Sequence, residues 1–399
     1  MNLLHLATGK NGGARLAAEQ LVMFQRLQGD NVTIIPGFSG EPDKFRSPKR
    51  KKIYSKFSTL TQKLMTNSEY GLVSTVSVSS ISKVILKAKE FDLVHIHNWF
   101  NMIKIQDLRV LSRKVPLVFT LHDQRLGTGG CHYTFDCRNY IQDCRECPAV
   151  KFGHGFVYKN KLKIDEIFAD IRPYGVIAPS NWILSELKNQ SIIKNAKSVN
   201  VIPNITEFKI QKKDNFRNKI YRKRFEILFI ASEINQPVKG LLLLLKSLNN
   251  LSHKYPDLHL NIVGRGTLED KMNFSYTHHG FLSRSKVFEL MNKSSICVVP
   301  SLMDNLPSVI IEAMQNKCIV ISTDVGGIGD LVIDGHTGFL IKPSHVMLQE
   351  KIMQVFDLSR VEQETIRENA LIRINKKYSN NEIYQNHKNL YTEIINNGT

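Results

Sequence analysis

The sequence contains no apolar run that approaches the roughly 18 to 20 residues required for a membrane-spanning helix, although 42% of its residues are hydrophobic. Its first residues, MNLLHLATGKNGGA, also have neither the basic start nor the long apolar stretch of a secretory signal. These absences exclude an integral membrane protein of the helical class. They predict a cytoplasmic location.

Acidic residues are scarce: 36 Asp and Glu stand against 54 Lys and Arg, a net charge of +18. The segment Lys44–Lys56, KFRSPKRKKIYSK, has seven basic residues and no acidic one. Such a segment is attracted to anionic lipid head groups or a pyrophosphate-bearing acceptor, at about 1 kcal/mol per basic residue near a membrane. This favours a peripheral contact with the inner membrane surface, and a solvated loop is the alternative interpretation. Nucleic acid is disfavoured, because no helix-turn-helix, zinc-finger or aromatic RNA-binding signature accompanies the charge.

Cysteine is also rare, yet four of the six cysteines fall within 17 residues, at Cys131, Cys137, Cys144 and Cys147. Thiols stay reduced in the cytosol, so a cluster that ends in C-x2-C favours a structural zinc site over disulfides. Two alternatives stay open: free thiols, or His132 in place of one sulfur ligand. Cys297 and Cys318 lie in apolar segments and are predicted to be core residues.

A chain of 399 residues is long enough for two domains of about 150 to 200 residues each. Apolar segments alternate with helical patterns, beginning with a strand at Asn2–Ala7 and a helix at Ala14–Gln28, and several strands end in polar residues. This alternation predicts parallel, doubly wound sheets, that is, an α/β fold. The charged span Thr206–Arg224 is the predicted linker. Further strands are predicted at Val32–Pro36, Asp92–Ile96, Leu117–Leu121, Tyr174–Ala178, Asn200–Ile202, Glu226–Ala231, Leu258–Val263, Ile296–Val299 and Cys318–Ser322.

The most informative segment is Ile296–Ile341. An apolar run there is followed by Asp304, then by Glu312 eight residues later on a helical pattern, and a second apolar run ends at Gly326-Gly327. Ligands of open α/β sheets bind beyond the strand carboxyl ends, where unpaired backbone donors are exposed. The pattern therefore predicts a ligand site at this sheet edge.

This segment resembles the retaining glycosyltransferases of family four, whose motif has two acidic residues separated by seven others. Here the motif reads Asp304-x7-Glu312, with Asp where most members have Glu. The resemblance implies the GT-B fold, two Rossmann-like domains that face each other across a cleft. It also implies that Asp304 faces the donor sugar, that Glu312 accepts from the nucleotide ribose, and that Asn305 and Leu306 line the same site.

The resemblance extends to the domain plan. It implies an acceptor-side domain over 1–205, a donor domain over 206–375, and a last helix over 376–399 that packs back on the first domain. The cysteine-rich insertion at 127–150 is similar to one found in a bacterial surface-polysaccharide branch of the family.

Lys239-Gly240 follows the apolar strand EILFIAS. Departure of a nucleotide diphosphate requires a cation or helix dipole near the phosphate oxygens, and Lys239 is the predicted cation. Similar enzymes have an Arg five residues earlier, where this sequence has Ile234. Arg265 is one candidate for that second cation, and a Lys-Gly pair taken alone indicates only an exposed turn.

Three weaker signals complete the predicted site. Gly12-Gly13 opens the first helix and lets backbone amides approach a diphosphate, although a plain tight turn has the same pattern. His122 stands at a strand end, where the resemblance sets it against the donor sugar and a satisfied polar residue is the alternative. The resemblance also implies that Arg265, in a lone G-x-G turn, and Gly280-Phe281 line the nucleotide base.

Together these features predict a retaining glycosyltransferase that moves a sugar from a nucleotide diphosphate donor to a lipid-linked or oligosaccharide acceptor. The expected product is a bacterial polysaccharide such as O-antigen, capsule or exopolysaccharide. No catalytic divalent metal is expected, because fixed cations and amides stabilise the leaving group. Two alternatives stay open: a sugar-nucleotide epimerase or phosphorylase on the same fold, and a non-catalytic partner in a polysaccharide assembly complex. The sequence makes no prediction of the base, the sugar or the oligomeric state.

Overall fold

The computed structural model describes residues 1–7, 12–35, 65–67, 73–74, 87–98, 103–171, 173–206, 223–268 and 272–397. The basic segment Lys44–Lys56 lies outside these residues, as does most of the predicted linker. The chain divides into two compact units. Unit 1 comprises Met1–Ile205 with Asn380–Thr399, and unit 2 comprises Thr206–Ser379.

Unit 1 is built on a six-stranded parallel sheet with the order β2-β1-β3-β4-β5-β6. Its central strands are buried along nearly their whole length; β5, YGVIA, is buried at every position. A strand covered on both faces needs apolar residues at consecutive positions, which explains its continuous apolar sequence. The strands are β1 (Asn2–Ala7), β2 (Asn31–Ile35), β3 (Leu93–Asn98), β4 (Leu117–Thr120), β5 (Tyr174–Ala178) and β6 (Ser198–Val201).

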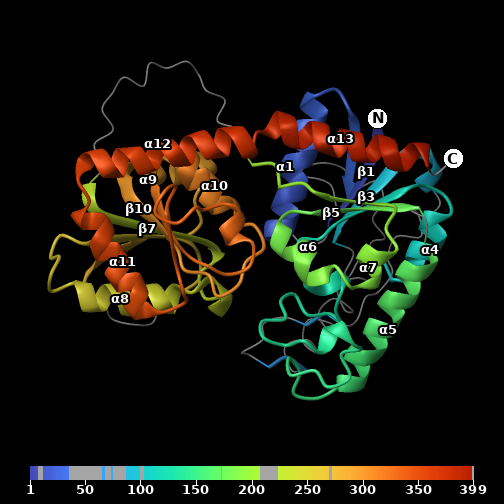
Figure 1. The fold of residues 1–399 in the computed structure, drawn as a ribbon, viewed down its shortest axis with the longest axis horizontal. Coiled ribbons are helices and arrows are strands. Elements are labelled where there is room, and N and C mark those ends of the chain that lie inside the picture. The colour runs from blue at the N-terminus through green and yellow to red at the C-terminus, as the bar shows by residue number, and fades with distance from the viewer. Residues whose placement is uncertain are drawn as a thin grey trace. The chain divides into compact units, whose positions relative to one another are not determined.

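Helices cover both faces of this sheet (Figure 1). One face packs on α1 (Gly13–Leu27) and α13 (Asn380–Asn396), which contact each other through Phe24 and Tyr384 with ring centroids 5.6 Å apart. The last helix of the chain is thus part of unit 1, although it begins 179 positions after the end of β6. The other face packs on α4 (Asp107–Ser112), α5 (His154–Asp170), α6 (Asn181–Leu187) and α7 (Ser191–Lys194).

Unit 2 has a second six-stranded parallel sheet, with the order β12-β11-β10-β7-β8-β9. Helices α8 and α11 cover one face, while α9, α10 and α12 cover the other. The strands are β7 (Lys223–Glu233), β8 (His259–Arg265), β9 (Ser275–His278), β10 (Ser294–Val299), β11 (Ile319–Thr323) and β12 (Phe339–Ile341). The helices are α8 (Leu241–Leu251), α9 (Arg284–Lys293), α10 (Ser308–Gln315), α11 (His345–Asp357) and α12 (Arg360–Lys377).

The predicted α/β class with doubly wound parallel sheets is confirmed. Two strands were not predicted, β9 and β12: β9 is an exposed edge strand of mostly polar residues, and β12 has only three residues. The helical pattern over Val361–Asn397 forms two helices, since Tyr378 leaves the helical conformation and its hydroxyl donates to the Asp330 carbonyl at 2.6 Å. Within the described part of the chain, no helix combines the length and apolar character of a membrane span.

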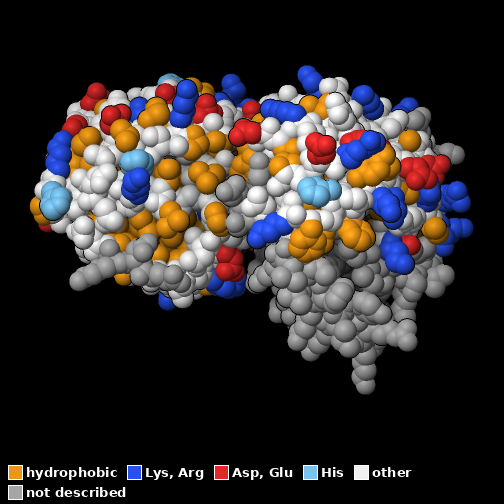
Figure 2. Space-filling view, turned by 90° about the horizontal axis from the view of Figure 1, so that it is seen from below, with side chains coloured by type: hydrophobic (Ala, Val, Ile, Leu, Met, Phe, Trp, Pro, Cys, Tyr) orange, Lys and Arg blue, Asp and Glu red, His pale blue; other side chains and the backbone are white. Residues whose placement is uncertain are grey.

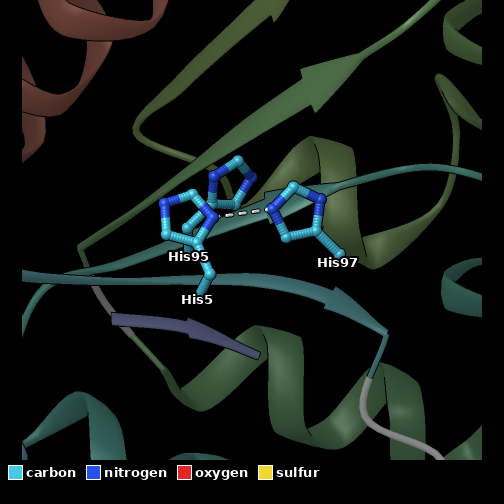
Figure 3. Close-up of side chains that lie close together, drawn as sticks. All are labelled: His5, His95 and His97. Carbon is cyan, nitrogen blue, oxygen red and sulfur yellow. Dashed lines mark hydrogen bonds between the residues drawn. The ribbon is translucent and has the colours of Figure 1, made fainter. Parts of the chain in front are cut away.

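The face of unit 1 that packs on α1 and α13 contains a polar core. His5 on β1 and His95 and His97 on β3 form what we call the histidine cluster, shown in Figure 3. Alternate residues of a strand point to the same face, and β1 pairs with β3 with His5 opposite His95, so the three rings gather on one side of the sheet. All three are buried, with exposed fractions of 0, 0 and 5%.

Hydrogen bonds satisfy most of these ring nitrogens. His95 Nδ1 lies 2.7 Å from the Tyr391 hydroxyl of α13, and His95 Nε2 lies 2.7 Å from Thr120 Oγ1 of β4. His5 Nδ1 lies 2.9 Å from His97 Nε2. The cluster therefore joins β1, β3 and β4 to the C-terminal helix through polar contacts inside an otherwise apolar layer.

Burial makes the cluster sensitive to acid. It lowers the pKa of His5 to about 3 and of the nearby His387 to about 4, and it lowers the pKa of His95 and His97 well below 6.5. The unfolded chain binds protons near pH 6.5, before the folded one, so stability is complete above that pH and is lost as the pH falls towards 4.

We predict that the free energy of unfolding, measured by urea titration, is level above pH 7. It should fall between pH 6.5 and 5 by about 1.4 kcal/mol per pH unit for each buried histidine. This window lies above the range in which ordinary carboxylates titrate. A stability that stays constant from pH 7 to pH 5 would contradict buried neutral histidines.

Candidate functional site

Lys239 is held at the carboxyl end of β7 by a tight loop. The short 3-10 turn Pro237–Lys239 is followed by Gly240 at φ 71°, a left-handed conformation that favours glycine. A Cβ atom at Gly240 would lie 1.8 Å from the Pro300 carbonyl oxygen, and Leu302 N donates to the Val238 carbonyl at 2.7 Å. The loop after β7 is thereby locked against the loop after β10.

Asp304 lies in the loop after β10, and its carboxylate has three donors. Lys239 Nζ donates to Oδ2 at 2.7 Å, Asn305 N donates to Oδ1 at 3.0 Å, and the Ser301 hydroxyl lies 3.5 Å from Oδ2. The Asp304 side chain is 10% exposed and the Lys239 side chain 29%. This Lys239–Asp304 pair is therefore partly desolvated, and each charge acts more strongly than it would at a wet surface.

The loop after β11 completes this group. Gly327 N donates to the Asp304 carbonyl oxygen at 3.0 Å. Gly326 has φ 59°, and a Cβ there would lie 1.8 Å from the same oxygen, so only glycine permits this approach. Since β7, β10 and β11 are neighbours in the sheet, their carboxyl ends bring Lys239, Asp304 and Gly326-Gly327 together. Asn305 and Leu306 are buried beside them, 4% and 6% exposed.

Glu312 lies on α10, the helix that follows this loop, and is 3% exposed. Its Oε1 is 2.5 Å from Nη1 of Arg284 at the start of α9. The contact is an ion pair without an aligned hydrogen bond, because this buried oxygen has no partner at hydrogen-bond geometry among the described residues. Glu312, like Asp304, is thus paired with a basic side chain of unit 2.

Arg265 and Phe281 form an exposed platform at the carboxyl end of β8. The guanidinium carbon of Arg265 lies 4.3 Å from the Phe281 ring centroid, and Phe281 is 65% exposed. Nη1 of Arg265 is also 3.5 Å from Glu233 Oε1. Gly280, at φ 62°, accepts a hydrogen bond at its carbonyl from Gly264 N at 2.9 Å.

The remaining predicted contacts belong to unit 1. Gly12 is the N-cap residue of α1 and Gly13 its first residue. His122 follows β4 and is partly exposed, and its Nε2 lies 2.9 Å from His97 Nδ1. The next residue, Asp123, is bound by Arg125 through both carboxylate oxygens at 2.6 to 2.9 Å, and burial of the ring lowers the pKa of His122 to about 4.

The four clustered cysteines are free thiols close to one another in unit 1, and Cys131, Cys144 and Cys147 are buried. The Cys131 thiol donates to Cys147 and lowers the pKa of Cys147 to about 7, while burial raises the pKa of Cys144 to about 12. Among the described residues, the group of at least three possible metal ligands that lie within 4.8 Å of one another is His5, His95 and His97.

The ring nitrogens of the histidine cluster are spaced closely enough to bind a metal ion, but most of them are already hydrogen-bonded. Both nitrogens of His95 and both nitrogens of His97 already make hydrogen bonds, and no carboxylate belongs to the group. A divalent ion in this dry core would have to displace those bonds with no anion to offset its charge. The cluster is a hydrogen-bonded network.

Two features of these sites were missed from sequence. Arg284 has no local pattern that links it to Glu312, because the two are 28 positions apart. The histidine cluster had a readable signal: HIHN places two histidines two positions apart, on one face of an apolar strand.

Comparison with known proteins agrees with this architecture. Residues 11–207 match the model of "Glycosyltransferase Family 4", and residues 210–373 match that of "Glycosyl transferases group 1". The chain is 24% identical over 340 residues to the uncharacterized glycosyltransferase MJ1178 of Methanocaldococcus jannaschii, covering 81% of this chain and 82% of the other. It is 25% identical over 200 residues to the capsular polysaccharide biosynthesis glycosyltransferase CapM of Staphylococcus aureus, covering 47% and 52%.

Solved structures give the same result for the fold. Anabaena Alr3699/HepE, in complex with UDP-glucose, aligns over 98% of this chain and all of its own with a TM-score of 0.63 at 17% identity. Sucrose-phosphate synthase from Thermosynechococcus elongatus aligns over 99% of both chains with a TM-score of 0.66 at 16% identity. The two family matches, which together cover residues 11–207 and 210–373, identify the chain as a glycosyltransferase of family 4, and the solved structures share its GT-B fold.

Proposed function

We propose that this protein is a retaining glycosyltransferase whose unit 2 binds the nucleotide-sugar donor at the Lys239–Asp304 pair. In this proposal Lys239 binds the diphosphate, Asp304 accepts from hydroxyls of the donor sugar, and Glu312 accepts from the ribose. The observation that supports it best is the 2.7 Å contact of Lys239 with Asp304 at the meeting point of three strand ends. Ligands of open parallel sheets bind at such points.

The electrostatics of the pair suit phosphate departure. As the bond between sugar and phosphate breaks, negative charge grows on the diphosphate, and a fixed cation in a partly dry site stabilises that charge without reorganising solvent. Asp304 holds the Lys239 ammonium in place before the donor arrives. When the diphosphate binds, Lys239 gains an anionic partner and Asp304 becomes available to sugar hydroxyls.

The other predicted residues take supporting roles in this proposal. Arg265 and Phe281 present a flat surface suited to a nucleotide base, and Gly280 supplies backbone hydrogen bonding. His122 contacts the donor sugar, and Gly12-Gly13 brings the amides at the start of α1 to the substrate. The leaving phosphate helps to deprotonate the acceptor on the same face of the sugar, so neither a protein nucleophile nor a catalytic divalent metal is required.

For the acceptor we propose a lipid-linked intermediate of a bacterial polysaccharide. CapM, a relative, carries the name of a capsular polysaccharide enzyme, and the net charge of +18 favours anionic pyrophosphate-linked acceptors and an anionic membrane surface. The UDP-glucose complex of HepE makes UDP-sugars the first donors to test.

Replacing Lys239 or Glu312 by Ala should lower kcat/KM for the donor at least about tenfold, because each change removes a charged contact to the nucleotide diphosphate. The measurement is sugar transfer at several donor concentrations with purified, folded variants. Lys293→Ala is the matched control, since Lys293 forms an exposed ion pair with Glu289 on the same unit. Near-normal transfer by both site variants at low donor concentration would exclude this donor site.

A further variant separates ligand binding from internal pairing at Glu312. Arg284→Ala breaks the ion pair with Glu312 but leaves the carboxylate in place. We expect it to lower stability while keeping more donor affinity than Glu312→Ala. Equal loss of donor affinity in both variants would mean that Glu312 acts only through Arg284.

For the cysteine segment we propose a structural zinc from its ligand set, since four thiols in one reduced cluster match the composition of such sites. Protein purified under reducing, zinc-replete conditions should contain about one zinc per chain by elemental analysis, and Cys144→Ser should lose it. A metal content near zero would contradict the zinc site and show that the four cysteines are free thiols.

A further inference from the structure

The carboxylate of Glu312 presents at most one of its two oxygens to a ligand. Its Oε1 lies 2.5 Å from Arg284 Nη1, and this oxygen is fully enclosed by the protein. The Glu312 side chain as a whole is 4% exposed, against 27% for the Arg284 side chain. A hydroxyl group that approaches the carboxylate from outside can therefore reach Oε2 but not Oε1.

The packing of α9 beside α10 fixes this arrangement. Arg284 is the first residue of α9, and Glu312 lies within α10. Both helices contribute to one apolar layer, to which α9 supplies Val287 and Met291. Beyond the end of α10, the amide nitrogen of Asn316 lies 3.7 Å from Met291 Sδ. Polar contacts about two turns apart on α9, with apolar packing between them, thus hold the Arg284 guanidinium against Glu312.

This ion pair resists separation by a ligand more than the Lys239–Asp304 pair does. The Lys239 ammonium is carried on a flexible stem, so it can turn from Asp304 towards a phosphate group. Withdrawal of Arg284 would instead leave a buried charge on Glu312 uncompensated, which is strongly unfavourable. We therefore expect the Arg284–Glu312 pair to persist when a nucleotide binds.

The pair also removes an electrostatic repulsion. An ionised carboxylate close to a nucleotide diphosphate repels it, and the repulsion is stronger in a partly dry site than at a wet surface. Arg284 balances the charge of Glu312 and still leaves Oε2 able to accept a hydrogen bond. Glu312 can thus accept from an anionic ligand without opposing its binding.

We propose that Arg284 is a specificity-determining residue that limits Glu312 to one hydroxyl group of the nucleotide ribose. Both oxygens of a free carboxylate can accept hydrogen bonds, one from each of the neighbouring 2′ and 3′ hydroxyls. With Oε1 held by Arg284, only Oε2 accepts, from one of the two. The site therefore tolerates a deoxynucleoside diphosphate that lacks the other hydroxyl. This inference rests on the proposed function, in which Glu312 contacts the ribose.

The direct test is the affinity of the full-length protein for a nucleoside diphosphate, its 2′-deoxy form and its 3′-deoxy form, measured by calorimetry. UDP is the first parent nucleotide, followed by GDP and ADP. We expect one deoxy form to bind at least about tenfold more weakly than the parent, the typical loss for a hydrogen bond to a charged group, and the other within about threefold. Losses of about tenfold for both deoxy forms, or of less than about threefold for both, would overturn the proposal.

Two variants connect the difference between the deoxy forms to this ion pair. In Glu312→Ala the two forms should bind equally within about twofold, because the acceptor is gone. In Arg284→Met, which keeps the length of the side chain without its charge, Oε1 is released. The deoxy form that the unmodified protein tolerates should then bind at least about threefold more weakly than the parent. Arg284→Ala gives the same readout if Arg284→Met does not fold.

Lys286→Met is the matched control, since Lys286 is an exposed cation on the same helix, and it should leave the three affinities unchanged. A difference between the deoxy forms that survives Glu312→Ala would overturn the proposal, as would one that is unaltered in folded Arg284 variants. The donor site is tested separately: failure of UDP, GDP and ADP all to bind would contradict the proposed function itself. A parent nucleotide that binds, with equal losses for both deoxy forms, would overturn only the role of Arg284.

Discussion

The ion pair between Lys239 and Asp304 is the contact on which the proposed donor site of unit 2 depends. It joins the loop after β7 to the loop after β10, and Gly326-Gly327 joins the loop after β11 to both. Without glycine at positions 240 and 326 the backbones could not approach this closely. The pair places opposite charges side by side. In the proposed function, the nucleotide diphosphate replaces Asp304 as the anionic partner of Lys239.

In unit 1, by contrast, the buried polar side chains are neutral and form hydrogen bonds with one another. Four histidines, one glutamine, one tyrosine and one threonine link β1, β3 and β4 to helices α1 and α13. Neutral rings avoid the desolvation cost that ionised groups would carry in this layer. The network is stable only while the rings stay uncharged, which ties the integrity of the unit to pH.

Much of the architecture could be predicted from sequence because parallel strands buried on both faces leave continuous apolar runs. Strand ends also concentrate polar residues, which is why Lys239 and Asp304 could be singled out. The pairing of Glu312 with Arg284 could not be predicted, since it depends on how α9 packs beside α10. The split of the last helical segment at Tyr378 likewise depends on a hydrogen bond to Asp330, 48 positions away. Nor could the spacing of the four cysteine sulfurs be read from their positions in the chain.

The central claim is that Lys239 exchanges its partner from Asp304 to the diphosphate of the donor. A crystal structure of the protein with a bound nucleotide diphosphate measures this directly. The account predicts a phosphate oxygen within hydrogen-bond distance of Lys239 Nζ, with the 2.7 Å contact to Asp304 lengthened or lost. A nucleotide bound with Lys239 still on Asp304 and no phosphate oxygen near it would contradict the account.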